Sequence, residues 1–439
     1  MLSILHTVVG YLLAPFCIVT WLICLVRHRR EIVQAEVIVQ ADRPHAFGTS
    51  LNIIEVTRRL HPGKRIVILL FREPNNHNPK LGLIFGPEIT FVSWRRPCFA
   101  FELFGRQVIL PPRTIHDGIA HRMSHWYFRR FCRDDVVLYD QPSLYKCLPA
   151  DPEGIAALPV KPNGERDVNA YTIDALLSRY FNKNEAPPYQ LPLELEADLD
   201  AKVLAASGVA PRMGWCGMHL KKDEGADTFK DGSPVEAYLP AIRKVIDAGY
   251  QILLKGDRRL PKGFQEQCQG MIVDANSLGV DPDIFNLYTI TKSDIFIGDS
   301  GPGTWMMGSR DIPSLALNVF PIGLGFSIKW VYFKRCIDDA GRPAPIEQLF
   351  SEISVFGNRP EGWKEETISE AEITDAVDQF LRQPYPIPSV DDHDEIVSLL
   401  PAWSCFRSVG VSRLSPAWVR KYAPQLNADA PDVKTAEQV

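Results

Sequence analysis

Short apolar segments alternate with amphipathic ones across the second half of the chain. Helical spacing runs from Glu236 to Ala248, with Pro234 near its start and Gly249 after its end. A second helix is predicted over Pro282–Thr291. The segments around these helices have the length and composition of buried strands: Arg212–Leu220, Tyr250–Leu254, Met271–Asp274 and Asp294–Gly298. Strands that alternate with helices in this way predict a parallel, doubly wound α/β sheet.

The first half of the chain repeats the pattern on a smaller scale. Glu36–Gln40 and Arg65–Phe71 read as strands, with a helix predicted over Leu51–Leu60 between them. Because 439 residues exceed what one hydrophobic core usually supports, we expect two Rossmann-like domains, at 31–195 and 196–390. A tail, 391–439, contains a predicted helix at Pro416–Tyr422 that we expect to pack back on the N-terminal domain.

An uncharged, mostly apolar run precedes both domains. Leu2–Val26 is long enough to cross a hydrocarbon core about 30 Å thick, which predicts a single transmembrane helix within residues 1–30. The basic cluster from Arg27 to Arg30 follows the run, which argues against a cleaved signal peptide and places the large domains on the cytoplasmic side. A buried core helix is the competing interpretation.

Composition excludes some partners. A net charge of -5 gives no reason to expect nucleic acid as a partner. The nine cysteines are scattered without metal-ligand spacing, which argues against structural zinc and a disulfide framework and suits a reducing compartment.

A glycine-rich turn is the most informative local motif. The strand Asp294–Gly298 leads through Gly301 and Gly303 into a helix predicted to begin near Thr304. Backbone N–H groups at a helix start can bind a phosphate, and glycines let it approach closely. The competing interpretation is an ordinary turn of a parallel sheet, because lone glycine clusters are weak signals.

Polar and basic residues gather at the carboxyl ends of the predicted strands, where ligands of such sheets bind. Any one of these residues, taken alone, is most simply a solvated loop residue. Their presence at three separate strand ends favours a binding site. The candidate nucleotide-binding residues are His219, Lys221, Lys222, Lys255, Gly256, Asp257, Asp299, Ser300, Gly301, Gly303 and Thr304. No Asp-x-Asp pair follows a strand, so we expect no metal and no cofactor.

The N-terminal domain offers two candidate catalytic bases. His45 and Asp42 lie in the loop that follows the first strand. Histidine titrates near neutral pH, so His45 is the first candidate and Asp42 the second. A structural or capping role for His45 is the competing interpretation.

Arginines and aromatic residues are dense from Trp94 to Arg133, ending in HRMSHWYFRRFCR. Such a segment suits either an anionic membrane surface or a core helix with a basic outer face. The aromatics are consecutive and form no clean stripe, which favours the core helix.

Several of these segments resemble a family of bacterial glycosyltransferases known from sequence. The resemblance lies in MHLKK, EAYLPAIRKVIDAGYQILLKGD, ITKSDIFIGDSGPGTWMMG and VSRLSPAWVRKYAPQL. These proteins are similar in pattern to nucleotide-sugar glycosyltransferases with two Rossmann-like domains, the GT-B type. The resemblance implies that the C-terminal domain holds the sugar nucleotide. Family members carry His-x-Arg after the first strand of that domain, and here Lys221 takes the arginine position.

Together these features predict a membrane-anchored, metal-independent glycosyltransferase. Its partners would be a nucleotide sugar and a surface-glycan or lipid-linked acceptor. Two alternatives stay open: a catalytically silent nucleotide- or glycan-binding subunit of a polysaccharide assembly system, and a non-glycosyl group transferase acting on a glycan. The departure at Lys221 keeps the silent subunit in view, because lysine lacks the bidentate fork of arginine.

Overall fold

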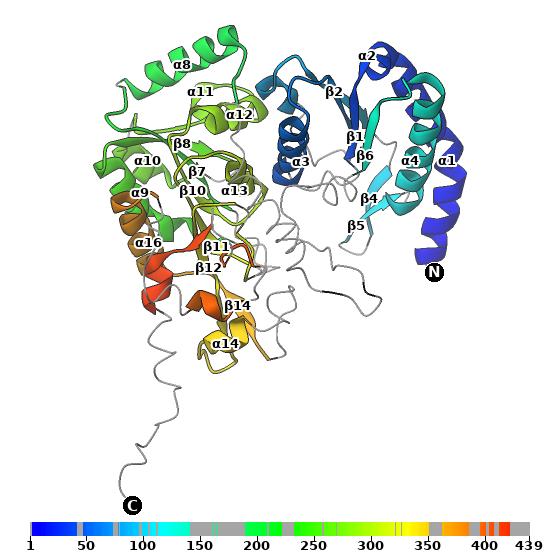
Figure 1. Cartoon of the computed structure of the whole chain (residues 1–439). Helices are drawn as coiled ribbons and strands as arrows, with labels where there is room; N and C mark the ends of the chain where they lie inside the picture. Colours follow the sequence, from blue (N-terminus) through cyan, green and yellow to red (C-terminus); the bar gives the residue numbers. More distant parts are fainter. Residues whose placement is uncertain are drawn as a thin grey trace, which may run out of the picture. The chain divides into compact units, whose positions relative to one another are not determined.

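The computed structural model divides the chain into two compact units, Met1–Cys147 and Leu148–Val439 (Figure 1). This boundary differs from the predicted one at 195/196, and it places the N-terminal helix in unit 1. The structure describes residues 2–41, 47–72, 78, 80–95, 99–103, 106–110, 113–140, 160, 164, 189–208, 210–221, 232–256, 259–268, 270–320, 322–325, 327–350, 362–385, 396–400, 404–407 and 412–421.

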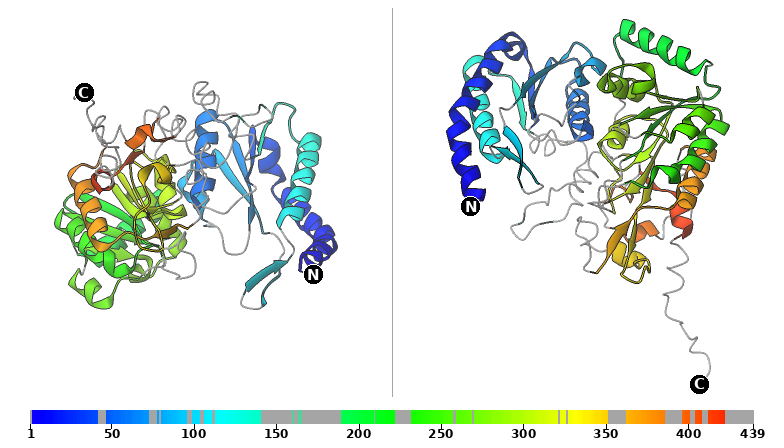
Figure 2. Two further views of the ribbon diagram at one scale, coloured as in Figure 1. Left: turned by 90° about the horizontal axis from the view of Figure 1, so that it is seen from below. Right: turned by 180° about the vertical axis from the view of Figure 1, so that it is seen from behind.

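Unit 1 is built on a four-stranded parallel sheet in the order β3-β2-β1-β6. Helices α1 and α4 lie on one side of this sheet and α3 on the other, so the described part forms three layers (Figures 1 and 2). A separate hairpin is formed by β4 and β5. The elements are α1 (Leu2–Arg27), α2 (Arg29–Gln34), β1 (Val37–Ala41), α3 (Phe47–Leu60), β2 (Ile66–Arg72), η1 (Leu81–Ile84), β3 (Ile89–Arg95), β4 (Phe99–Leu103), β5 (Arg106–Leu110), α4 (Arg113–Phe131) and β6 (Val137–Asp140).

The second half of α1 is part of the unit 1 core. Cys17, Trp21 and Leu25 recur every four residues, so they share one helix face, and all three are buried. Trp21 packs on Trp94 of β3, with ring centroids 5.2 Å apart, and its Nε1 donates to Ser124 Oγ of α4 at 2.9 Å. Within the described part of the chain, no helix is long and apolar enough to span a membrane. The predicted transmembrane helix is therefore unconfirmed.

Unit 2 contains a seven-stranded parallel sheet in the order β15-β12-β11-β10-β7-β8-β9, which the alternating pattern predicted over its central strands. Helices α9 and α16 pack on each other, and α12 packs against β7 and β8. The elements that form and surround the sheet are α8 (Leu193–Ser207), β7 (Gly214–His219), η2 (Val235–Tyr238), α9 (Leu239–Asp247), β8 (Tyr250–Lys255), α10 (Lys262–Gln267), β9 (Ile272–Asp274), α11 (Ala275–Leu278), α12 (Pro282–Lys292), β10 (Ile295–Asp299), α13 (Pro302–Trp305), η3 (Met306–Ser309), β11 (Ser314–Val319), β12 (Trp330–Phe333), α16 (Glu370–Arg382) and β15 (Arg413–Leu414). A small antiparallel pair, β13 (Arg335–Ile337) with β14 (Lys364–Glu366), and α14 (Ile346–Leu349) complete it.

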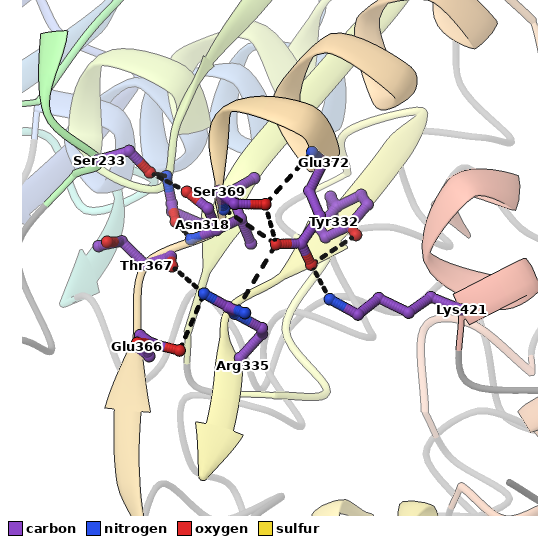
Figure 3. A network of polar contacts seen from close by, with 10 residues as sticks. Ser233, Asn318, Tyr332, Arg335, Glu366, Thr367, Ser369, Glu372 and Lys421 are labelled. Carbon is purple, nitrogen blue, oxygen red and sulfur yellow. Dashed lines mark hydrogen bonds and ion pairs between the residues drawn. The ribbon is translucent and has the colours of Figure 1, made fainter. Parts of the chain in front are cut away.

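The described part of the C-terminal tail packs on unit 2. Its packing on the N-terminal domain stays a prediction. β15 adds to the edge strand β12, and residues 416–421 form a short helix. Trp418 of this helix is fully buried, with its ring 5.6 Å from that of Phe333. Lys421 donates to Glu372 at the start of α16, within the polar network shown in Figure 3. Both apolar burial and charge pairing therefore hold the tail on unit 2.

Candidate functional site

The strand order of unit 2 brings several candidate residues together at one point of the sheet. The chain runs from β7 outward to β8 and β9, and then returns to form β10 on the other side of β7. The order reverses between β7 and β10, and open α/β sheets bind ligands beyond the carboxyl ends of the strands at such a point. β7 ends at His219, β10 at Asp299 and β8 at Lys255. Three of the predicted residues therefore meet at the switch point.

The glycine turn after β10 has fewer free donors than the sequence suggested. Ser300 N–H is part of the sheet and donates to Leu317 O at 2.8 Å, and Thr304 N–H donates to Gly301 O at 3.0 Å. Pro302 has no N–H. The amides that this turn can offer are those of Gly301 and Gly303. The helix itself also differs from the prediction, because α13 has four residues and continues as the 3-10 turn η3, so its dipole contributes little.

The imidazole of His219 explains the glycines near it. A Cβ added to Gly303 would lie 2.9 Å from His219 Cδ2 and Nε2, and one added to Gly256 would lie 3.3 Å from Cδ2. Gly256 also has φ +93°, a conformation that side chains other than glycine rarely adopt. These two glycines therefore make room for the histidine ring, a role that the sequence pattern did not reveal.

Hydrogen bonds orient this ring. Thr304 Oγ1 donates to Asp299 O at 2.5 Å and lies 3.4 Å from His219 Nδ1. Because the Thr304 proton points to the carbonyl, its oxygen is left to accept from Nδ1–H. The assigned tautomer then leaves Nε2 as an acceptor beside Gly303.

The electrostatics keep His219 uncharged. Burial, followed by the positive charges of Lys255 and Lys221, lowers the pKa of His219 to about 3. Its ring therefore acts as a neutral hydrogen-bonding group at physiological pH.

Lys255 links β8 to the glycine turn. Its Nζ is buried, donates to Gly303 O at 3.0 Å and lies 3.7 Å from Met306 Sδ. Burial lowers the pKa of Lys255 to about 7, since a charged ammonium loses water there. The lysine is thus placed to gain a proton when an anion approaches.

Asp299 is a buried structural group and not a surface ligand. Lys221 N–H donates to Asp299 Oδ2 at 2.8 Å, and Asn318 Nδ2 donates to Oδ1 at 2.8 Å. Tyr238 OH donates to the same Oδ1. Burial raises the pKa of Asp299, although these hydrogen bonds act in the opposite direction. The carboxyl group therefore holds the start of the Lys221 loop, and its role as a nucleotide-binding residue stays a prediction.

Two partners in this network were not recognised from the sequence. Tyr238 lies within the predicted helix Glu236–Ala248, and no sequence pattern singled out Asn318. Asn318 has φ +52° and accepts from Ile368 N–H at 2.9 Å, while Ser233 Oγ donates to Ile368 O at 2.7 Å. Figure 3 shows Asn318 and Ser233 beside the α16 terminus. Only the fold brings these distant segments together, so no local signal could have identified them.

Lys221 lies beside the turn. A Cβ on Gly301 would be 3.9 Å from Lys221 Cε, and the Lys221 amide is fixed by Asp299. The described site thus contains His219, Lys221, Lys255 and the two glycine amides. Among the predicted residues, Lys222 and Asp257 lie outside the described part of the chain.

The candidate bases Asp42 and His45 also lie outside the described residues. The strand that they follow is described. β1 lies between β2 and β6, and the order reverses there, because the chain builds β1, β2 and β3 before returning to β6. β1 therefore ends at the switch point of unit 1.

Comparisons with known proteins found distant structural similarity alone. No family model and no curated protein matches the chain, so the bacterial family of the resemblance is not confirmed. The chain is similar to a glycosyl transferase family 9 structure from Veillonella parvula DSM 2008 (12% identity, TM-score 0.39, 66% of this chain and 82% of that chain). It is also similar to E. coli ADP-heptose lps heptosyltransferase II (13%, 0.36, 64% and 84%) and to Arabidopsis thaliana UGT89C1 complexed with UDP-L-rhamnose (10%, 0.34, 90% and 99%). These similarities are too distant to assign an activity.

Proposed function

We propose that the chain is a glycosyltransferase that holds a nucleotide sugar at the carboxyl edge of the unit 2 sheet. The observation that carries this proposal is the meeting of His219, Lys255 and the Gly301–Gly303 turn at the switch point between β7 and β10. A neutral imidazole, two basic side chains and glycine amides form a set suited to a diphosphate.

The chemistry of sugar transfer needs charge stabilisation on the departing nucleoside diphosphate. Lys221 is the proposed charge partner at the surface of the site, and Lys255 becomes a second one when it gains a proton. The amides of Gly301 and Gly303 add hydrogen-bond donors. Positive charge from lysines serves the purpose of a metal ion, so we propose a metal-independent reaction.

The acceptor side of the proposal rests on unit 1. A base there would remove the proton of the acceptor hydroxyl as the sugar transfers, and His45 and Asp42 remain the candidates. We propose a lipid-linked or surface-glycan acceptor, because the apolar N-terminal segment suggests work at a membrane. We place the large domains on the cytoplasmic side of that membrane, because nucleotide-activated donors are available there.

A thermal-shift screen of the full chain in mild detergent tests the donor site. The full chain is needed because Trp21 and Leu25 belong to the unit 1 core. UDP, GDP, ADP, CMP and dTDP are compared, each with and without EDTA. A ligand at 100 times its Kd stabilises the folded protein by about 2.7 kcal/mol, so binding raises the Tm. A rise in Tm with one nucleotide that persists in EDTA supports the proposal. Folded protein that shifts with none of them contradicts it.

Two lysine variants make the screen specific. Lys221→Ala should weaken diphosphate binding about tenfold or more, which corresponds to roughly 1.4 kcal/mol. Lys202→Ala is the matched control, because Lys202 lies on α8, paired with Asp198. Equal binding by both variants would remove Lys221 from the site.

The silent-subunit alternative is favoured by one observation. The His219 ring covers Gly303, and two amides of the turn are already used within the protein. This subunit could bind nucleotide without transferring sugar. Hydrolysis or transfer of a radiolabelled sugar from the nucleotide identified by the screen separates the two functions. The same screen with activated donors of other groups tests a non-glycosyl transferase.

A further inference from the structure

The outward face of α1 is apolar. Phe16, Val19, Ile23 and Val26 follow helical spacing, and each is between 53% and 62% exposed. They lie on the side of the helix opposite Cys17, Trp21 and Leu25, which are buried in the unit 1 core. A helix that covers a water-soluble domain normally presents polar residues outward. The exposed stripe of α1 is therefore suited to an apolar surrounding.

Helix α4 runs parallel to α1 and extends this surface. Three contacts fix the direction: Trp21 Nε1 donates to Ser124 Oγ at 2.9 Å, Arg29 lies 5.8 Å from the centre of the Phe131 ring, and Cys132 Sγ lies 3.7 Å from Ile32 O. Figures 1 and 2 show the two helices side by side. On α4, Trp126 is 55% exposed and Phe131 39% exposed. The carboxyl ends of both helices thus lie at the same end of the surface.

That shared end carries exposed positive charge. The arginines are Arg27, Arg29, Arg30, Arg129 and Arg130. Arg29 and Arg130 both lie against the Phe131 ring, at 5.8 and 6.0 Å from its centre. The acidic residues nearby along the chain are Glu31, Asp134 and Asp135, and Asp135 is paired with Arg133. Among the described residues at this end, positive charges outnumber negative ones, so the end complements an anionic surface.

We propose that the outward face of α1, with the exposed side of α4, rests on an anionic lipid bilayer, and that α1 lies in the plane of the membrane. An exposed apolar stripe, with arginines at its end and an exposed tryptophan on the neighbouring helix, has the residue types that contact a membrane interface. Arginines near such a surface gain attraction from anionic headgroups.

The packing of α1 favours this mode over a transmembrane span. Cys17, Trp21 and Leu25 are enclosed by protein, so the second half of α1 cannot cross the hydrocarbon core while unit 1 is folded. The part from Leu2 to Phe16 is about 22 Å long at 1.5 Å per residue, shorter than the roughly 30 Å of a bilayer core. The inference is independent of sugar transfer and applies equally to a silent subunit.

Flotation of the full chain with lipid vesicles tests the proposal. Binding to vesicles of phosphatidylcholine with 30% phosphatidylglycerol should exceed binding to pure phosphatidylcholine by roughly tenfold or more, and it should fall with added salt. Ile23→Glu with Val26→Glu should lower binding to the anionic vesicles by about tenfold or more, because charge replaces buried apolar area. Arg27→Gln with Arg29→Gln and Arg30→Gln should lower the preference for anionic lipid, since only Arg129 and Arg130 remain of the five arginines.

The control is Leu204→Glu on α8, which changes a residue 53% exposed in unit 2 and should leave flotation unchanged. Circular dichroism and thermal unfolding confirm that each variant is folded. Wild-type protein that stays with the vesicles in carbonate at pH 11, and binds regardless of the Glu substitutions, would establish a transmembrane helix and overturn the proposal. A dimer in detergent-free solution that Ile23→Glu converts to a monomer, without any change in flotation, would show that a second copy covers the stripe and would also overturn it.

Discussion

The imidazole of His219 lies directly over Gly303, so close that an added Cβ would be 2.9 Å from two ring atoms. β7 supplies the histidine and the turn after β10 supplies the glycine, so the contact spans the switch point of the sheet. On the other side of Gly303, its carbonyl oxygen accepts from Lys255 Nζ of β8. One glycine therefore connects three strand ends, and its substitution should disturb the whole site.

Gly303→Ala should lower nucleotide affinity by about tenfold or more and destabilise the protein by roughly 1–3 kcal/mol, because the His219 ring must move. Urea unfolding and nucleotide titration measure the two effects. Gly263→Ala is the control, since nothing lies within 4 Å of a Cβ at that helical position. It should leave affinity unchanged and stabilise by up to about 1 kcal/mol. If Gly303→Ala combined with His219→Ala is no more stable than Gly303→Ala alone, the ring does not cause the strain.

Lys255 should make stability depend on pH. Burial lowers its pKa in the folded protein to about 7 from the ordinary 10.5, so the unfolded chain binds more protons between these values. The free energy of unfolding should therefore rise with pH in this window, by up to about 1.4 kcal/mol per unit. Lys255→Met should remove that contribution. Urea unfolding at pH 7, 8, 9 and 10 measures both slopes, and equal slopes would show that the ammonium remains charged in the folded state.

Trp21 should be essential for unit 1. Trp21→Ala deletes a fully buried indole and its hydrogen bond to Ser124, so a loss of about 3–5 kcal/mol is expected. Phe16→Ala removes an aromatic ring of the same helix from an exposed position and should change stability in detergent by no more than about 0.5 kcal/mol. Chemical unfolding in detergent measures both. If both variants lost only a little stability, α1 would not pack on the domain in solution.

Acid should weaken the charge pairing that holds the tail on unit 2. Burial alone would raise the pKa of Glu372, but hydrogen bonds from Lys421 and Ser369 outweigh it and lower the pKa (Figure 3). A carboxyl group with a lowered pKa stabilises the fold above its unfolded pKa and loses that effect as the pH falls through the folded value. Glu372→Gln should therefore lower Tm at pH 7 by roughly 2–4 °C and have a smaller effect in acid. Thermal unfolding at pH 7 and in acid measures the Tm of both proteins. A difference in Tm that does not depend on pH would contradict the charge pairing.

Part of the fold could be predicted from local patterns. The alternation of apolar runs with amphipathic helices predicted the strands that became β7, β8, β9 and β10 and the parallel sheet that contains them. The predicted strand ends also carry His219 and Lys255, and the structure places both beside the glycine turn. These features follow from short-range periodicity, which can be read from neighbouring residues in the sequence.

The N-terminal helix shows where such patterns lose information. Apolar residues surround α1 on all sides, so Phe16 and Trp21 look equivalent in the sequence. Packing decides between them, because Trp21 finds Trp94 and Ser124 while Phe16 remains exposed. The sequence could predict an apolar helix, but not which face the protein would bury.

The sequence by itself determined the parallel α/β architecture, the positions of the basic residues at the strand ends and the apolar character of the first helix, because each depends on neighbours along the chain. The tertiary structure decided the rest. Asp299 became an internal anchor because Tyr238 and Asn318 reach it from other elements, and Gly303 serves the His219 ring because two strands meet there. These roles depend on contacts between residues far apart in the sequence, and folding alone brings them within reach.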